Sequence, residues 1–404
     1  MKKIEEWKKT FIKIYIGQSC SLITSSIVQY AIIWYLTYKT SSAMWLSIAS
    51  LAGFLPQGIL GLFIGSYIDK RNRKKIMIMS DIFISFVTLV MVIYAIFGEL
   101  PIPLILICLS LRSIGTAFHS PALHATLPLV VPQENMLKYS GLSQSMQSIS
   151  LIVSPAIAAL LYDKIDMYLI LFLDVIGVMI ATFTLIISKI PSPKNTNIDE
   201  VNIINETIEG FKIIKQNKVV KDIFIISGFF ILLYMPINSL FPLITTSHFK
   251  RSSFALGLIE ISFAVGMLIG GLILGKERLF NNKKRNIIVS MLMIAIAILI
   301  TGLLPKNMFN VFIVTSFFMG FSSPMLNASV NTIFAEQVKP DFLGRIYSNY
   351  MSLMVITMPI GLLLSGIFAD KIGISIWFTI TAILLLIVVF GIVINKNQFN
   401  KQND

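Results

Sequence analysis

The sequence predicts an all-α integral membrane protein with twelve transmembrane helices in two pseudo-symmetric six-helix bundles. Of the 404 residues, 55% are hydrophobic and only 13% are charged, whereas a soluble domain carries about 25% charged residues. The mean hydropathy is +0.81. These values exclude a soluble globular protein and an intrinsically disordered chain. The third observation is that the apolar residues form long continuous runs separated by short polar breaks.

Twelve of these runs are long enough to cross a bilayer, because a transmembrane helix needs about 20 apolar residues. Their continuity, without alternation of polar and apolar residues, excludes a transmembrane β-barrel. We expect no cleavable signal peptide, since the first run is too long and no small-residue cleavage site follows it. The expected spans are residues 11–37, 44–67, 76–97, 103–126, 140–162, 167–188, 222–246, 254–275, 286–304, 310–333, 346–369 and 374–394.

Basic residues predict the orientation of the helices, because inner loops are enriched in Lys and Arg. With the N-terminus inside, 25 of the 33 Lys and Arg residues fall in inner segments and six fall in outer loops. The even number of spans then returns the C-terminus to the inside. The net charge of +13 is therefore a signal of topology, and binding of nucleic acid is the weaker interpretation.

A long polar stretch divides the chain into halves of six spans each. We expect an N-terminal bundle at residues 1–188, a cytoplasmic linker at 189–221 and a C-terminal bundle at 222–404. Apolar residues at helical spacing in the linker predict an amphipathic helix on the inner membrane face. The segment SPALHAT at 120–126 recurs as SPMLNAS at 323–329, which indicates duplication. Paired bundles of this kind form transporters that rock one half against the other.

Three charged residues lie deep within the expected spans. Arg112 is about 14 Å past Pro103 at 1.5 Å per residue, where an unpaired charge costs at least ~2.5 kcal/mol. Arg112 must therefore hold a partner, and Asp174 lies at a similar depth. Burial favours a protonated carboxyl group and a nearby arginine favours a carboxylate, so Asp174 and Glu260 are candidates for a proton carrier or for fixed structural struts. His119 shares a helical face with Arg112 and could relay protons or simply bond a neighbouring backbone group.

The loop after the second span carries the motif Gly65-x-x-x-Asp69-Lys-x-Asn-Arg73-Lys-Lys. A carboxylate at Asp69 can stabilise the positive N-terminal end of a neighbouring helix. The basic residues can pair with acids on adjacent spans, of which Asp81 is the nearest. Contacts of this kind would hold one conformation and release in another. The motif therefore predicts a gate formed by Gly65, Asp69, Arg73 and Asp81, and a solvated basic loop is the alternative.

Neutral polar side chains also occur within the spans, where exposure to lipid would be costly. They must face a cavity or another helix, and among aromatic and methionine side chains they suit a large, weakly charged ligand. The candidates for a substrate cavity are Gln18, Ser25, Gln29, Gln144, Gln147, Tyr234, Asn238, Asn327 and Asn331.

The sequence predicts no metal site, cofactor or enzymatic centre. The three histidines are scattered, and Cys20 and Cys108 both lie in apolar runs. The segment 270–276 matches the spacing of a phosphate-binding loop, but Glu277 follows where Ser or Thr is required, so we expect no bound nucleotide. The glycines at 266, 270, 271 and 275 instead predict close packing between helices.

The motif at 65–75 resembles the signature loop of the major facilitator superfamily, with Asn72 where that pattern normally has Gly. The segment 111–115 resembles the Arg-x-x-x-Gly signature of the superfamily, with Gly one place early. Ser154-Pro155 stands where antiporters usually have Gly-Pro. Over nearly the whole chain, the sequence is similar to bacterial macrolide-efflux transporters of the drug:proton antiporter group, as in the runs GQSCSLITS, RSIGTAFHSPAL, SQSMQSISLIVSPAIAALLY, MPINSLFPLI, EISFAVGMLIGGLILG and MPIGLLLSGIFADKIG.

This resemblance implies the major facilitator fold and proton-driven export of macrolide antibiotics by alternating access across the bacterial cytoplasmic membrane. The implied partners are a small-molecule drug, protons and membrane lipid, for a monomer that binds neither nucleotide nor nucleic acid. The alternatives are export of tetracycline, a siderophore or a lipid-like metabolite, proton-coupled import, and a membrane sensor or scaffold without transport. The buried charges argue against a passive scaffold, because they are costly without a use.

Overall fold

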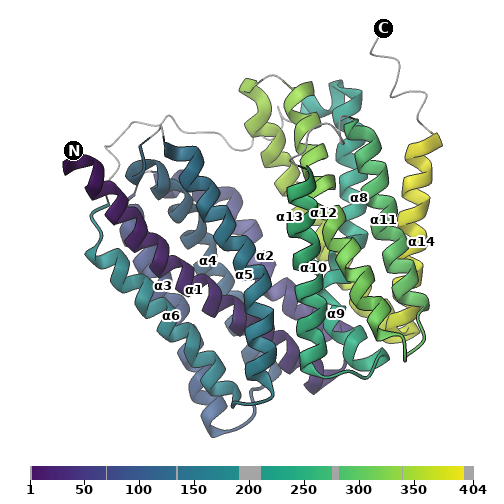
Figure 1. Ribbon diagram of the computed structural model, residues 1–404, viewed down its shortest axis with the longest axis horizontal. Coiled ribbons are helices and arrows are strands. Elements are labelled where there is room, and N and C mark those ends of the chain that lie inside the picture. The colour runs from purple at the N-terminus through teal and green to yellow at the C-terminus, as the bar shows by residue number, and fades with distance from the viewer. Residues whose placement is uncertain are drawn as a thin grey trace. The chain divides into compact units, whose positions relative to one another are not determined.

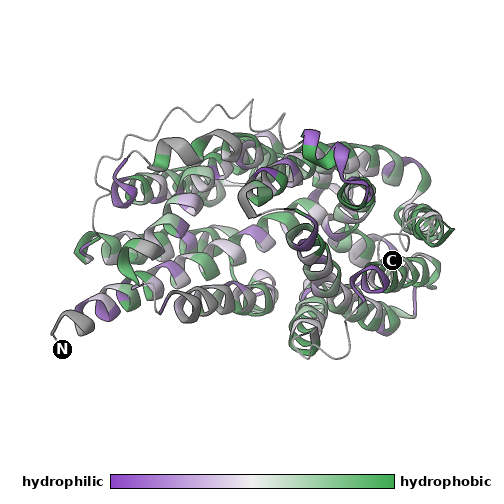
Figure 2. Cartoon of the chain, turned by 90° about the horizontal axis from the view of Figure 1, so that it is seen from above, coloured by the Kyte–Doolittle hydropathy of each residue, from purple (hydrophilic) through white to green (hydrophobic). Residues whose placement is uncertain are grey.

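The computed structural model describes residues 2–69, 71–132, 135–190, 211–274, 282–338 and 340–394. Within these ranges nearly every residue is helical and none lies in a strand, which confirms the predicted all-α class. Eleven of the described helices are long and apolar enough to cross a membrane, and a shorter apolar stretch occupies Ile149–Tyr162. Hydrophobic residues prevail along the helices in Figure 2. The chain is therefore a multi-pass membrane protein, in agreement with the twelve expected spans.

The first of two compact units comprises Met1–Leu36 and Ala49–Val201. Within it, α3 packs against both α4 and α6 (Figure 1). The Asn72 side chain caps α3 by accepting a hydrogen bond from the Lys75 backbone N–H at 3.1 Å, which explains why this helix begins at Arg73. The helices that contribute to this unit are α1 (Lys2–Thr40), α2 (Ala43–Asp69), α3 (Arg73–Phe97), α4 (Ile102–Val130), α5 (Met136–Tyr162) and α6 (Met167–Ile187).

The second unit comprises Thr37–Ile48 and Asn202–Asp404. Its α12 packs between α10 and α11, and α14 packs against α11 (Figure 1). The elements are α8 (Lys218–Ser239), α9 (Phe241–Leu243), the π-helix η2 (Ile244–His248), α10 (Ser253–Leu274), α11 (Lys283–Leu303), α12 (Phe309–Gln337), α13 (Pro340–Ile372) and α14 (Ile374–Ile394). Most of the linker in which we expect an amphipathic helix, residues 191–210, lies outside the described ranges.

The first turn of α2 belongs to the second unit, because a carboxylate of α13 binds it. Asp370 accepts hydrogen bonds from the Ser42 hydroxyl at 2.5 Å and from the backbone N–H groups of Ala43 and Met44 at 2.6 and 3.1 Å. The two backbone N–H groups are donors that a helix N-terminus leaves without partners inside the helix, and a negative charge there is favourable. One turn earlier on α13, Gly366 leaves room for Met44.

Glycines let α10 and α12 approach until their backbones touch. A Cβ atom placed on Gly266, Gly270 or Gly320 would collide with the backbone carbonyl of Phe317, Phe321 or Phe263, respectively. A Cβ atom on Gly271 would meet no atom within 4 Å. The expected close packing is thus present at Gly266 and Gly270 and absent at Gly271, while Gly275 lies outside the described ranges.

Candidate functional site

The first unit contains a buried ion pair between Arg112 on α4 and Asp174 on α6. Asp174 is fully buried and Arg112 is 8% exposed. Thr88 on α3 donates to Asp174 Oδ2 at 2.9 Å and also contacts the Arg112 guanidinium, while Ser25 on α1 donates to Asp174 Oδ1. Four helices therefore meet at one carboxylate, and the partner expected for Arg112 from its depth is present.

Thr88 is the member of this network that sequence reasoning missed. It stands seven residues after Asp81 on α3, so the two residues share a face of the helix. That spacing is the only signal in the sequence that could have identified it.

A cavity of about 430 Å³ lies within the first unit. Its wall includes five of the residues expected to act in transport, namely Gln18, Ser25, Asp81, His119 and Gln147. Neither Arg112 nor Asp174 lines it; Ser25 connects the two features, because it lines the cavity and also binds Asp174. The remaining polar residues of the wall include Ser21, Thr116, Ser120 and His124.

Two of the expected cavity residues are not part of this wall as described. Gln29 is not among the lining residues. Its amide nitrogen lies next to Gly53 of α2, and a Cβ atom added to that glycine would be 3.8 Å from this nitrogen. The side chain of Gln144 lies outside the described part of the structure.

The residues of the expected gate lie on different elements. Asp81 on α3 faces His119 on α4, with Oδ1 3.2 Å from Nε2. This is an ion-pair distance, although the angles do not form a hydrogen bond. Arg73 donates from Nη1 to the Ala125 carbonyl oxygen at 2.6 Å. The neighbour of Asp81 is therefore a histidine of the cavity wall, where we expected the basic loop. The surroundings of Gly65 and the side chain of Asp69 are outside the described residues, so the gating role stays a prediction.

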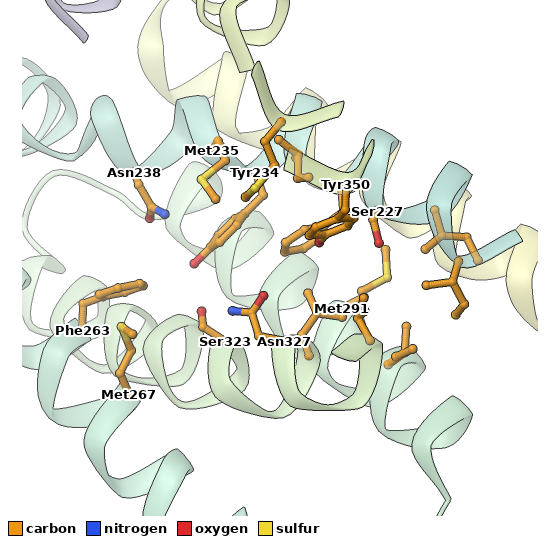
Figure 3. A pocket seen from close by; sticks show the side chains of 18 residues that line it. Ser227, Tyr234, Met235, Asn238, Phe263, Met267, Met291, Ser323, Asn327 and Tyr350 are labelled. Carbon is orange, nitrogen blue, oxygen red and sulfur yellow. The ribbon is translucent and has the colours of Figure 1, made fainter. Parts of the chain in front are cut away.

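A second cavity, of about 230 Å³, lies within the second unit between α8, α10, α11, α12 and α13. Tyr234, Asn238 and Asn327, three of the expected cavity residues, line it together with Ser323 and Tyr350 (Figure 3). None of its described lining residues is charged. Methionine side chains, which adapt to varied shapes, come from Met235, Met267, Met291 and Met354.

Two buried polar atoms at this second cavity, the Tyr234 hydroxyl and Asn238 Oδ1, form no hydrogen bond of standard geometry with the described residues, although the Ser323 and Asn238 side chains lie close to the hydroxyl. Figure 3 shows both side chains on the same side of the cavity, across from Ser323 and Asn327. A buried polar group without a partner costs about 1–3 kcal/mol, so a ligand that can donate and accept hydrogen bonds would relieve this cost.

Asn331 and Glu260 are not among the residues of either cavity wall. The Asn331 backbone carbonyl accepts a hydrogen bond from the Tyr347 hydroxyl at 3.3 Å. Glu260 is half-buried on α10, one turn before Phe263, which does line the second cavity.

Comparison with known proteins identifies the family. The family model described as transmembrane secretion effector matches residues 7–403. The chain belongs to this family of the major facilitator superfamily. The expected resemblance to this superfamily is thus confirmed.

Its relatives include transporters that export drugs. Over 391 residues, and 96% of both chains, it is 46% identical to macrolide efflux protein A of Streptococcus pyogenes. It is 45% identical to macrolide efflux protein A of Enterococcus faecalis, over 80% of this chain and 99% of that protein. The multidrug efflux pump Tap of Mycolicibacterium fortuitum is 21% identical over 88% of both. The protein is therefore a major facilitator efflux transporter.

Solved structures confirm the fold. A POT family transporter in complex with 5-aminolevulinic acid matches with a TM-score of 0.76 at 11% identity, covering 97% of both chains. A bacterial homologue of the human lysosomal transporter Spinster matches with a TM-score of 0.72 at 12% identity, covering 98% of both. At such low identity these matches establish the major facilitator fold alone.

Proposed function

We propose that this transporter exports macrolide antibiotics across the bacterial cytoplasmic membrane in exchange for protons. The observation that carries the proposal is the 46% identity to macrolide efflux protein A, which extends over 96% of both chains. In the proposed arrangement both termini are cytoplasmic, and the monomer works by alternating access without enzymatic activity, cofactor or nucleotide.

The two cavities support an amphipathic cargo. The cavity of the second unit joins aromatic and methionine side chains to neutral hydrogen-bonding groups such as Tyr234 and Asn327. A macrolide combines an apolar ring with many hydroxyl groups, and a largely apolar wall with a few polar groups suits such a ligand. The cavity of the first unit adds titratable side chains, which proton coupling requires.

The energy available from protons is sufficient for export. One elementary charge that crosses the membrane is worth ~2.3 kcal/mol per 100 mV. For an uncharged cargo, one proton per cycle at ~150 mV therefore supplies about 3.5 kcal/mol, which sustains a gradient of a few hundred-fold at about 1.4 kcal/mol per factor of ten. Exchange of one proton for one monovalent cation moves no net charge and is driven by the pH gradient.

The test is erythromycin accumulation in cells that express the protein, compared with cells that carry the empty vector. We expect expression to lower accumulation, and a protonophore to restore it while cellular ATP is kept constant. Export that stops when ATP is depleted in the presence of an intact proton gradient would contradict the energy source. A panel that adds tetracycline, a siderophore and a lipid-like compound tests the cargo, because a relative at 24% identity is named a staphyloferrin A transporter. Unchanged accumulation of every macrolide would refute the substrate assignment.

A further inference from the structure

Asp81 lies in the wall of the larger cavity. Its carboxylate does not have a hydrogen-bond partner for every oxygen among the described residues. It is 3% exposed and lines the cavity of about 430 Å³ in the first unit. Its Oδ2 has no hydrogen-bond partner among the described residues, and neither has the His119 Nε2 that lies 3.2 Å from its Oδ1. A buried carboxylate in this state has bonding capacity left for something that enters the cavity.

Asp174 differs from Asp81 in each of these respects. It is fully buried and does not line the cavity. The Arg112 guanidinium compensates its charge, and Ser25 and Thr88 donate to its two oxygens. A proton or cation that reached Asp174 would have to break this network, whereas Asp81 is available at the cavity wall.

The groups packed around Asp81 provide little compensation for a negative charge. From α1 the Gln18 side chain lies within hydrogen-bonding reach of it, and from α4 it is faced by His119, with His124 five residues further along the same helix. From α6 the nearby charge is Asp174, which Arg112 neutralises. In the described surroundings of Asp81, His119 is thus the group that can balance its charge from within the protein.

An uncompensated charge in a buried position is expensive, so before cargo binds we expect a proton to be shared by the Asp81 and His119 side chains. A cationic ligand can replace that proton, because its charge also balances the carboxylate. The neutral polar residues Ser21, Ser25 and Thr116 line the same cavity and can bind the uncharged parts of the ligand.

We propose that Asp81, together with His119, binds the ammonium group of a cationic amphipathic cargo and releases one proton when that cargo binds. The inference rests on the proposed proton-coupled export and assigns its coupling site to the first unit. The step is balanced: the O–H bond of the Asp81 carboxyl group breaks, the proton leaves to the water of the cavity, and the ammonium group pairs with the carboxylate. The net charge of the site is the same before and after exchange.

The experiment measures proton release by the purified full-length protein in weakly buffered detergent solution. The probe is tetraphenylphosphonium, a permanent cation that has no proton of its own to release. Wild type should release up to one proton per bound cation near neutral pH, as reported by a pH-sensitive dye. Asp81→Asn should bind the probe at least about tenfold more weakly, which corresponds to the loss of a charged partner, and should release no proton.

Matched variants separate this result from unfolding and from rival sites. Glu336→Gln removes an exposed carboxylate that pairs with Lys283 on the second unit and should behave as wild type. Asp81→Glu should keep proton release, which shows that loss in Asp81→Asn follows from the missing carboxyl group. If Asp81→Asn does not fold, the wild-type measurement can still overturn the inference, because the inference requires proton release whenever the probe binds. Loss of release in Glu260→Gln, with release intact in Asp81→Asn, also overturns it.

The outcomes also distinguish this inference from the proposed function. If cells export erythromycin and Asp81→Asn still releases protons on binding, the inference fails and macrolide export stands. If wild type releases protons on binding the probe, Asp81→Asn does not, and cells do not export any macrolide, the assignment of Asp81 stands and the cargo is a different cation.

Discussion

Asp174 on α6 forms an ion pair with Arg112 on α4, and neither residue lines the adjacent cavity. Breaking a buried pair by removing one partner typically costs 3–5 kcal/mol, because it leaves an uncompensated charge. We therefore expect Arg112→Leu and Asp174→Leu each to lower the free energy of unfolding by about 3–5 kcal/mol. The double variant should be more stable than either single variant, because no charge is left alone.

The measurement is a double-mutant cycle on unfolding in detergent. The control cycle uses Lys283 and Glu336, whose side chains are 36% and 48% exposed at 2.6 Å separation, and it should give a coupling of about 0–1 kcal/mol. Additive losses for Arg112 and Asp174 would mean that the two residues do not interact.

Asp69, the last residue of α2, is predicted to act in gating. Asp69→Asn should slow the transport cycle while drug affinity changes little, because the expected contact controls the conformational equilibrium and not cargo binding. Turnover in proteoliposomes and equilibrium binding of erythromycin, measured on the same preparation, test this. A collapse of affinity with normal turnover would contradict the gating role.

Gly270 and Gly271 are neighbours in sequence that should respond differently to the same substitution. A Cβ atom at Gly270 meets the Phe321 backbone, whereas at Gly271 it meets nothing within 4 Å. Gly270→Ala should lower the unfolding free energy by about 1–3 kcal/mol, as overpacking does. Gly271→Ala should leave it unchanged or raise it slightly, since alanine favours the helix. Equal losses of thermal stability in the two variants would refute the close contact between α10 and α12.

Tyr234→Phe should have opposite effects on stability and on affinity. Its hydroxyl is buried and forms no hydrogen bond of standard geometry with the described residues, so removing it should stabilise the free protein by up to about 1 kcal/mol. If a bound macrolide provides the missing hydrogen bond, affinity should fall by about two- to tenfold. Tyr94→Phe is the control, because Tyr94 is 52% exposed on α3. Unchanged erythromycin binding by Tyr234→Phe would remove Tyr234 from the substrate site.

The amino-acid sequence by itself determined the class of protein, the positions of the spans and the need for a partner at Arg112. These features depend on properties that are local along the chain. A run of about 20 apolar residues crosses a bilayer wherever its neighbours lie, and a buried guanidinium is costly whichever helix compensates it. The depth of Asp174 along its own helix made it the candidate partner, and the structure shows the pair.

The tertiary structure decided which carboxylate reaches a cavity, because this depends on how each helix is rotated about its axis. One residue along a helix turns a side chain by about 100°, and packing against neighbouring helices sets that rotation. Asp81 consequently faces His119 at the cavity wall, whereas Asp174 faces Arg112 in the protein interior. The same reason separates Gly270 from Gly271 and places Tyr234 and Asn238 at one cavity while Gln29 faces another helix. The spacing of residues in the sequence shows which side chains share one face of a helix. Only the packed bundle shows which neighbouring helix or cavity that face contacts.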